Sequence, residues 1–182
     1  MEMSSEVSTR LQLPNLYLVI VNITKQSNVR ALLLTATAFG CQAVLVVGQE
    51  KNLLTENLPI PFQNQVKAGR IALLRFVKWV HCVDYLIEHN ISLVGVEIDE
   101  TALILDDDYF THRPFYQDTA ILMGNEGQGI HPKHMQACDA ICRIPQYGVG
   151  TASLNVNVAA SLVLYRFSEE KRKMRERHRK RS

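Results

Sequence analysis

Long apolar runs, the pattern of an export signal and zinc-finger cysteine spacing are all missing from this sequence of 182 residues. No stretch approaches the ~20 consecutive apolar residues that a membrane-spanning helix requires. The N-terminal segment 1–14 contains two glutamates and no apolar core, so it lacks the pattern of a secretory signal. We therefore expect an intracellular protein, cytoplasmic or nuclear, that is not secreted and does not contact a membrane.

Metal and disulfide frameworks are also disfavoured. The four cysteines, Cys41, Cys82, Cys138 and Cys142, include one Cys-x3-Cys pair but no second His or Cys pair at zinc-finger spacing. The sequence therefore predicts buried free thiols in a reducing compartment and no metal site.

The net charge of +2 conceals a strong asymmetry. Residues 171–182 contain eight Lys or Arg and one Glu, or +7, whereas the remaining residues contain twelve basic and seventeen acidic groups, or −5. A cationic end of this density favours a nucleic-acid partner. A nuclear-import signal or a merely solubilising frayed terminus are the alternatives.

Alternating apolar runs predict the fold class. Strands are expected at 16–21, 43–47, 72–80, 91–98, 119–123 and 140–144, and helices at 29–39, 81–89, 132–138 and from Leu154 onward. Segment 50–69 is expected to be a loop with a short helix, and segment 99–118 a loop with a short helical turn. This order predicts an α/β three-layer sandwich around a mostly parallel sheet. The expected organisation is a flexible N-terminus (1–14), one domain (15–168) and a basic tail (169–182).

The glycine-rich stretch ILMGNEGQGIHP, residues 121–132, does not fit a phosphate loop. Its glycine spacing differs from the dinucleotide fingerprint, and no Lys-Ser/Thr pair follows as in a P-loop. A carboxylate at Glu126 would also repel a phosphate. The glycines instead allow a ligand to approach the backbone closely.

Two further stretches contain polar residues where helices begin. Residues 22–40 form an amide-rich turn that enters a helix near Asn28, and residues 144–165 carry Asn155, Asn157 and Ser161 in an otherwise apolar helix. Either Thr151 or Ser153 is expected to cap the second helix. Each stretch taken alone is equally consistent with a plain helix start.

Together the three stretches resemble the three motifs of the SpoU/TrmH family of RNA ribose 2′-O-methyltransferases, in the SPOUT superfamily. Asn28-Val29-x-Ala31 with Thr35-Ala36-x-Ala38-Phe39-Gly40 resembles motif one. Motif two is matched by Leu122-x-Gly124-Asn125-Glu126-Gly127-x-Gly129-Ile130, and motif three by Ile144-Pro145 with Ser153-Leu154-Asn155-Val156. The resemblance extends from about Leu16 to Tyr165.

This resemblance implies a deep C-terminal trefoil knot, a homodimer and S-adenosyl-L-methionine as cofactor, without a metal. Cofactor contacts are implied for Leu122, Gly124, Gly127, Gly129, Ile144, Gln146 and Leu154. Catalytic positions are implied for Asn28, Glu126, Ser153 and Asn155. Fixed amides and hydroxyls can hold the ribose, and a carboxylate can orient them or accept the proton.

Motif one departs from the family at two positions. Its arginine is replaced by Leu34, and its glycine is Arg30. If this segment is helical, Arg30 lies one turn before Leu34 on the same face. Our hypothesis is that Arg30 replaces the missing arginine; the alternatives are a solvent-exposed Arg30 and weakened or lost catalysis.

Two functions are therefore expected in order of preference. The first is methylation of a ribose 2′-hydroxyl in RNA, with tRNA ahead of rRNA. The second is a catalytically silent RNA-binding homodimer that retains the cofactor pocket. RNA contacts are expected from Arg30 and from the tail residues Lys171, Arg172, Lys173 and Arg175.

Overall fold

A parallel β-sheet organises the protein in the computed structural model, which describes residues 13–48, 58–100, 102–105, 117–125, 128–148 and 153–180. The strands within these ranges are β1 (Leu16–Val21), β2 (Ala43–Val47), β3 (Ala72–Phe76), β4 (Ser92–Val96), β5 (Leu103–Ile104), β6 (Thr119–Met123) and β7 (Ala140–Arg143). Their order in the sheet is β3-β2-β1-β6-β4-β7-β5. Every pairing is parallel, so the carboxyl ends of the strands share one edge.

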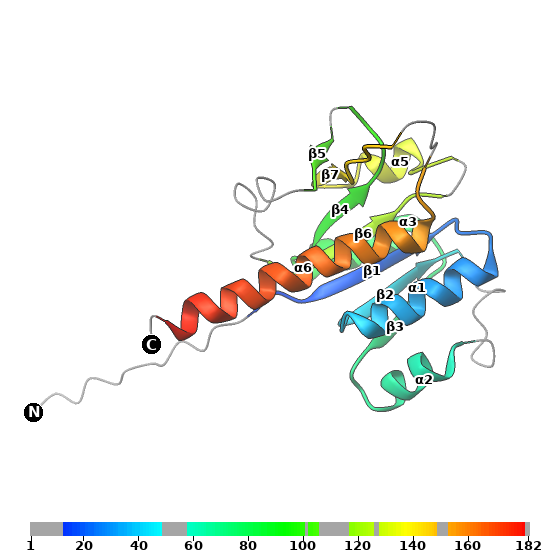
Figure 1. Ribbon diagram of the computed structural model, residues 1–182. Helices are drawn as coiled ribbons and strands as arrows, with labels where there is room; N and C mark the ends of the chain where they lie inside the picture. Colours follow the sequence, from blue (N-terminus) through cyan, green and yellow to red (C-terminus); the bar gives the residue numbers. More distant parts are fainter. Residues whose placement is uncertain are drawn as a thin grey trace, which may run out of the picture.

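Helices cover both faces of this sheet (Figure 1). Their bounds are α1 (Gln26–Ala38), α2 (Ile60–Lys67), α3 (Trp79–Glu88), α5 (Pro132–Met135) and α6 (Val156–Arg179). Helices α1, α2 and α6 pack against one face, where Leu32, Phe62 and Phe167 join the alternate strand residues Leu18 and Ile20. The opposite face packs against α3 and α5. The predicted α/β three-layer sandwich is confirmed.

Most strand predictions are confirmed, and the errors lie at the ends of elements. The runs at 16–21, 43–47 and 119–123 have the expected bounds, because each strand is buried on both faces. The run 72–80 was wrong as one strand: β3 ends at Phe76, and Trp79 begins α3. Segment 99–118 contains the short strand β5, and α1 begins three residues before the expected Val29.

Helix α6 extends well beyond the sheet. It has 24 residues, or about 36 Å at 1.5 Å per residue. Its first half packs on the core through Val156, Ala160 and Val163, whereas its second half projects away from the sheet (Figure 1). The expected basic tail is therefore helical from Glu169 to Arg179.

The four cysteines are free thiols, as predicted, and all but Cys138 are buried. Burial raises the pKa of the Cys41, Cys82 and Cys142 thiols to about 12. These side chains therefore act as small apolar residues of the core. Among the described residues, no helix is long and apolar enough to cross a membrane.

Candidate functional site

The candidate site lies at the carboxyl edge of the sheet, where the polar residues that follow several strands converge. Asn22 follows β1, Glu97 follows β4, Gly124 and Asn125 follow β6, and Ile144 follows β7. Ligands of open parallel sheets bind in crevices at this edge. The order β1-β6-β4-β7 brings these positions together although they are far apart in the sequence.

The motif-two loop is fixed at three points. Asn125 and Gly129 exchange backbone hydrogen bonds of 2.9 Å in both directions, which closes the loop between them. The Asn125 side chain donates to the carbonyl of Asn22 at 2.5 Å, and the Ile130 N–H donates to the Glu97 carboxylate at 2.5 Å. The loop is thus tied to the ends of both β1 and β4, so its backbone is held ready for a ligand.

Two glycines of this loop are required by their surroundings. Gly129 has a φ of +65°, and a Cβ there would lie 2.2 Å from Glu97 Oε2. A Cβ on Gly124 would lie 2.9 Å from the Gly129 carbonyl carbon and 3.0 Å from the same carboxylate oxygen. Side chains at either position would therefore collide with backbone or with Glu97.

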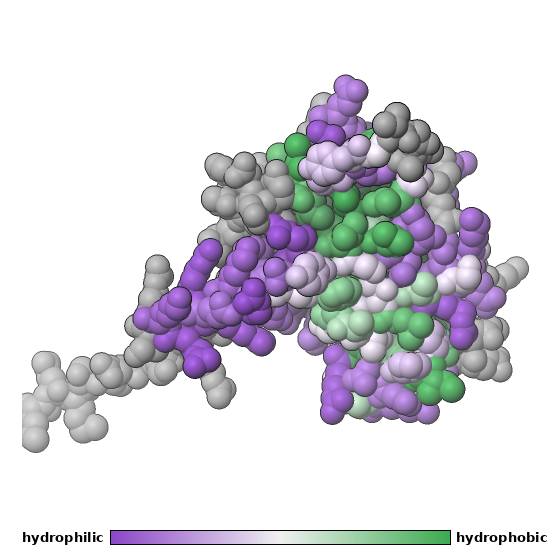
Figure 2. All heavy atoms as spheres, in the orientation of Figure 1, coloured by the Kyte–Doolittle hydropathy of each residue, from purple (hydrophilic) through white to green (hydrophobic). Residues whose placement is uncertain are grey.

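A cavity opens between this loop and the start of α6. Its open space, including the part exposed to solvent, is about 530 Å³. It is lined by Val96, Glu97, Ile98, Met123, Gly124, Asn125, Gly129, Ile144, Gln146, Ser153, Leu154, Val156 and Ala159. Figure 2 shows hydrophobic side chains gathered on this side of the molecule, over β4 and the first half of α6.

The cavity brings together six of the residues predicted from the sequence: Gly124, Gly129, Ile144, Gln146, Ser153 and Leu154. Leu122 does not line it, because its side chain is buried in the core on the α3 side of the sheet. Glu126 and Gly127 lie outside the described residues. The binding roles of all these residues stay predictions.

Asn28 and Asn155 meet beside the cavity. The Asn155 Nδ2 donates to Asn28 Oδ1 at 3.4 Å, and Asn155 neighbours the lining residues Leu154 and Val156. The Asn28 side chain is buried, and its Nδ2 has no hydrogen-bond partner. A buried donor without a partner is costly, so it points to a group that binds there.

The cap of α6 is Asn155, so the prediction of Ser153 as cap was wrong. Asn155 Oδ1 accepts the N–H of Asn157 at 2.9 Å. This bond commits the Asn155 oxygen to the helix and leaves its amide nitrogen to face Asn28. The alternative candidate, Thr151, lies outside the described residues.

A second polar contact joins the same two helices. Thr35 Oγ1 in α1 donates to Asn157 Oδ1 in α6 at 2.7 Å, and Ser161 donates to the carbonyl of Asn157. The unexpected polarity of Asn157 and Ser161 is thus structural. It holds α1 against α6 and thereby fixes the distance between Asn28 and Asn155.

Arg30 and Leu34 are both helical and both exposed, and the Leu34 side chain is 41% exposed. Their spacing of four residues places them on one face of α1, as the sequence predicts for a helical segment. Neither residue lines the cavity. Arg30 lies on the same helix turn as Asn28.

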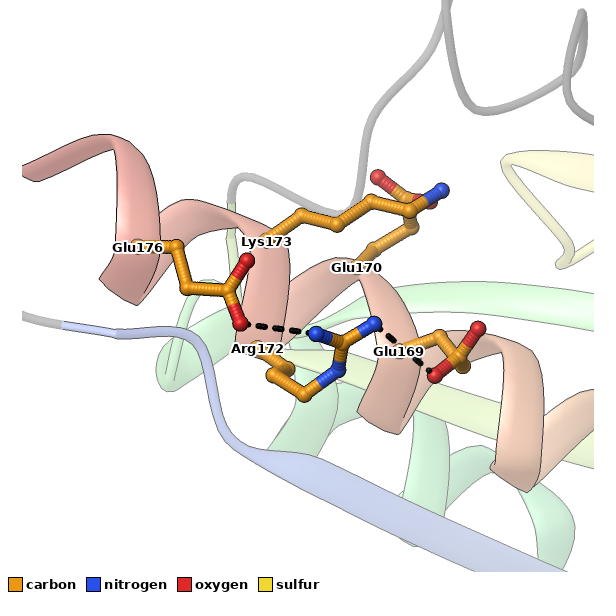
Figure 3. Close-up of polar contacts among 5 residues, drawn as sticks. All are labelled: Glu169, Glu170, Arg172, Lys173 and Glu176. Carbon is orange, nitrogen blue, oxygen red and sulfur yellow. Dashed lines mark hydrogen bonds and ion pairs between the residues drawn. The ribbon is translucent and has the colours of Figure 1, made fainter.

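The predicted RNA-binding residues of the tail lie on the second half of α6. Arg172 pairs with Glu169 at 3.4 Å and with Glu176 at 2.7 Å, while Lys173 pairs with Glu170 at 2.6 Å (Figure 3). The Arg172 pairs are exposed and stabilise the helix weakly, so another anion can replace their carboxylates, whereas Glu170 is buried.

Lys171, the first cation of the tail, is partly buried, unlike the exposed Arg172. Burial lowers the pKa of the Lys171 ammonium, as does repulsion by Arg175, whereas the carboxylate of Asp118 acts in the opposite direction. Arg175 takes part in none of the ion pairs found among the described residues.

A histidine pair lies next to the motif-two loop. His131 caps α5 by accepting the Lys133 N–H at 3.2 Å. The buried His134 ring packs on Trp79 with centroids 4.5 Å apart. Trp79 is thus a packing residue. No cluster of metal-ligating side chains occurs in the ranges that the structure describes.

Glu97 and Asn125 were missed as site residues by sequence reasoning. The signal for Glu97 was available, because it is the first charged residue after a buried parallel strand. The sequence shows Asn125 only as part of the motif-two pattern. Its bond to Asn22 forms because β1 and β6 are neighbours in the sheet.

Comparisons with known proteins agree with this architecture. The model of the SpoU rRNA Methylase family matches residues 15–165. The 23S rRNA (guanosine-2′-O-)-methyltransferase RlmB of Coxiella burnetii is 27% identical, with 87% of this chain and 60% of the relative covered. RlmB of Acinetobacter baylyi is 31% identical, with 82% and 58% covered. The chain thus spans about 60% of the length of these curated relatives.

Solved structures show the same fold. A crystal structure of an RNA 2′-O ribose methyltransferase has a TM-score of 0.66 at 28% identity and covers 95% of this chain and 62% of its own. The SpoU methyltransferase AviRb of Streptomyces viridochromogenes, solved with AdoMet, has a TM-score of 0.65 at 22% identity, with 94% and 63% covered. The family match over most of the chain, on this sheet and with these motifs, shows that the chain belongs to the SpoU rRNA Methylase family.

Proposed function

We propose that this protein transfers a methyl group from S-adenosyl-L-methionine to a ribose 2′-hydroxyl of RNA. The observation that carries the proposal is the cavity at the carboxyl edge of the sheet, with the Asn28–Asn155 pair beside it. Family membership and the similarity to 2′-O-methyltransferases support the same reaction.

The described residues fit the methyl donor. The two glycines bring the loop backbone to the cavity wall, and apolar side chains such as Ile144 and Leu154 provide surfaces for a flat base. Backbone groups of Gly124, Ile144 and Leu154 would hold the donor, with Gly129 and Gln146 shaping the pocket. When bound, S-adenosylmethionine supplies a methyl group on a positively charged sulfur that is already activated for transfer.

The protein's task is then to align the ribose. Asn28 Nδ2 is a buried donor without a partner and is available for the ribose. Asn155 fixes the orientation of Asn28, and Ser153 lines the cavity next to it. Holding the 2′-oxygen in line with the transferable group lowers the barrier of such a reaction. Glu126 is proposed to orient these groups or to accept the proton.

Arg30 is proposed to supply the cation that the family's motif-one arginine provides. It is exposed on α1, one turn before Leu34 and two residues after Asn28. We expect Arg30→Ala to lower kcat roughly 100-fold, which is typical when one group that stabilises transition-state charge is removed. The affinity for S-adenosylmethionine should be unchanged. Methyl-transfer kinetics measure this, with Arg70→Ala on an exposed distant site as control. Equal activities of the two variants would contradict the role of Arg30.

RNA is the proposed partner, bound in part by Lys171, Arg172, Lys173 and Arg175 on α6. Phosphates can replace the glutamates that pair with the exposed Arg172. We propose tRNA ahead of rRNA as the substrate. The curated relatives quoted above are named for 23S rRNA, so both RNA classes belong in the assay.

A homodimer is proposed through α1 and α6. Leu34, Val158, Leu162 and Tyr165 are exposed apolar residues on these adjoining helices. Val158, Leu162 and Tyr165 recur at helical spacing, so they share one face of α6. Leu34 thus adds apolar surface where the family has an arginine.

The proposed trefoil knot involves the chain from β6 to α6, because β7 lies beyond β4 in the sheet while α6 returns to pack with α1.

The second candidate function is a catalytically silent RNA-binding homodimer, which Leu34 favours. Calorimetry with S-adenosylhomocysteine and transfer of a labelled methyl group to RNA separate the two functions. The proposed enzyme binds S-adenosylhomocysteine and methylates RNA, and its Asn28→Ala variant binds the ligand but transfers poorly. Ligand binding without transfer by the wild type supports the silent dimer. Absence of ligand binding contradicts both.

A further inference from the structure

Glu97 is a carboxylate inside the candidate donor cavity that none of the three motifs includes. It follows β4 directly, is partly exposed, and lines the cavity beside Val96 and Ile98. Because β4 lies between β6 and β7, Glu97 faces the motif-two loop from the neighbouring strand end.

The surrounding backbone is arranged around this carboxylate. The Ile98 N–H donates to Oε1 at 2.9 Å, and the Ile130 N–H donates to Oε2 at 2.5 Å. Gly124 and Gly129 leave the space that the carboxylate occupies, because a Cβ on either would approach Oε2 to 3.0 Å or less. The orientation of Glu97 is therefore held from both sides.

Two backbone donors do not saturate a carboxylate. Its two oxygens offer about four acceptor positions, so roughly two remain for other donors. Glu97 is partly exposed and lines the cavity, where a ligand can supply these donors. A ligand with two adjacent hydrogen-bond donors would complete the site.

We propose that Glu97 accepts hydrogen bonds from the ribose hydroxyls of the methyl donor and so selects a ribonucleoside ligand. This inference rests on the proposed function. The apolar neighbours Val96, Ile98 and Ile144 can hold a flat base, and the attached ribose then lies next to the Glu97 carboxylate. An acidic residue after a parallel strand is chemically suited to a ribose diol, because each oxygen can accept one hydroxyl.

The test is the binding of S-adenosylhomocysteine compared with its 2′-deoxy and 3′-deoxy analogues, by calorimetry. For the wild-type protein, loss of a hydroxyl that donates to a carboxylate should weaken binding about 10- to 100-fold. In Glu97→Gln this discrimination should shrink to a few-fold, because the charged acceptor is gone. Glu100→Gln, which changes an exposed carboxylate three residues away, should discriminate as the wild type does.

A purely structural role for Glu97 predicts something different. If the carboxylate only held the motif-two loop, Glu97→Gln would weaken all three ligands by the same factor and leave their ratios unchanged. That result would overturn the inference. Glu97→Asp retains the charge but shortens the side chain by one methylene, so it should also lose discrimination between S-adenosylhomocysteine and its deoxy analogues. This variant replaces Glu97→Gln if Glu97→Gln fails to fold. If the wild-type protein bound no S-adenosylhomocysteine, the proposed function itself would fail.

Discussion

At the scale of single residues, the site depends on positions where no other side chain fits. Gly129 combines a left-handed backbone with a carboxylate where its Cβ would be, and Asn28 is a buried amide with an unused donor. The unused Asn28 donor is a cost to the folded protein that a bound ligand can offset. We therefore propose that the cavity is a binding site rather than a packing gap.

Gly129→Ala should reveal the close approach of Glu97, and Gly69 is a matched control. Both glycines have φ near +65°, but a Cβ on Gly69 would meet no atom within 4 Å. We expect Gly69→Ala to lower the free energy of unfolding by about 1–2 kcal/mol from backbone strain alone. Gly129→Ala should lower it by about 1–3 kcal/mol more, because the Glu97 side chain must move.

Urea denaturation of the two variants measures this difference, and calorimetry shows whether Gly129→Ala also loses S-adenosylhomocysteine binding. Equal destabilisation by the two substitutions would contradict the close packing of Gly129 on Glu97.

At the scale of elements, sequence patterns predicted what local forces determine. The apolar runs of β1, β2 and β6 gave exact strand bounds because both faces of these strands are buried. The edge strands were predicted less well: β3 is partly exposed and β5 has two residues, so neither has a clear apolar pattern.

Contacts between elements were not predictable in the same way. The cap of α6 was assigned to Ser153 or Thr151 because both are good capping residues near the helix start, but Asn155 forms the bond. The Thr35–Asn157 and Asn28–Asn155 contacts join residues more than 120 positions apart. Only the tertiary arrangement of α1 and α6 creates them.

The α5 segment should make stability depend on pH. Burial against Trp79 lowers the pKa of His134 below its usual value of about 6.5, and nearby His131 and Lys133 act in the same direction. The unfolded chain therefore binds a proton more readily than the native one. The stabilising effect of a neutral His134 is present above pH ~6.5 and is lost as the pH falls through the lowered native pKa.

We expect His134→Leu to reduce the fall in unfolding free energy between neutral and mildly acidic pH. Urea denaturation across this range measures it, with His89→Leu as an exposed-histidine control. A pH dependence in His134→Leu identical to that of the wild type would contradict the burial of a neutral ring.

At the scale of the whole molecule, charge and apolar surface are separated along α6. The first half of the helix carries Val158, Leu162 and Tyr165 on its exposed side, and the second half carries most of the cations. Figure 2 shows this change from mixed or apolar to strongly polar surface along the helix. The arrangement suits a dimer contact near the site and an RNA contact farther out.

Leu162→Glu should disrupt the proposed dimer. An ionised carboxylate in an apolar interface is strongly unfavourable, so the dimer dissociation constant should rise at least about 100-fold. Sedimentation velocity measures the change, with Ile87→Glu on the exposed side of α3 as control. A wild-type protein that is monomeric at high concentration, or a Leu162→Glu variant that dimerises normally, would exclude this interface.

The central claim is ribose methylation of RNA by this protein, and mapping of 2′-O-methyl groups tests it most directly. RNA from cells that lack the protein is compared with RNA from cells that express the wild type or Asn28→Ala, with tRNA and rRNA mapped separately. We predict that at least one ribose 2′-O-methyl group is lost, is restored by the wild type, and is not restored by Asn28→Ala. Identical methylation maps in all these cells would contradict the claim and leave the silent RNA-binding dimer.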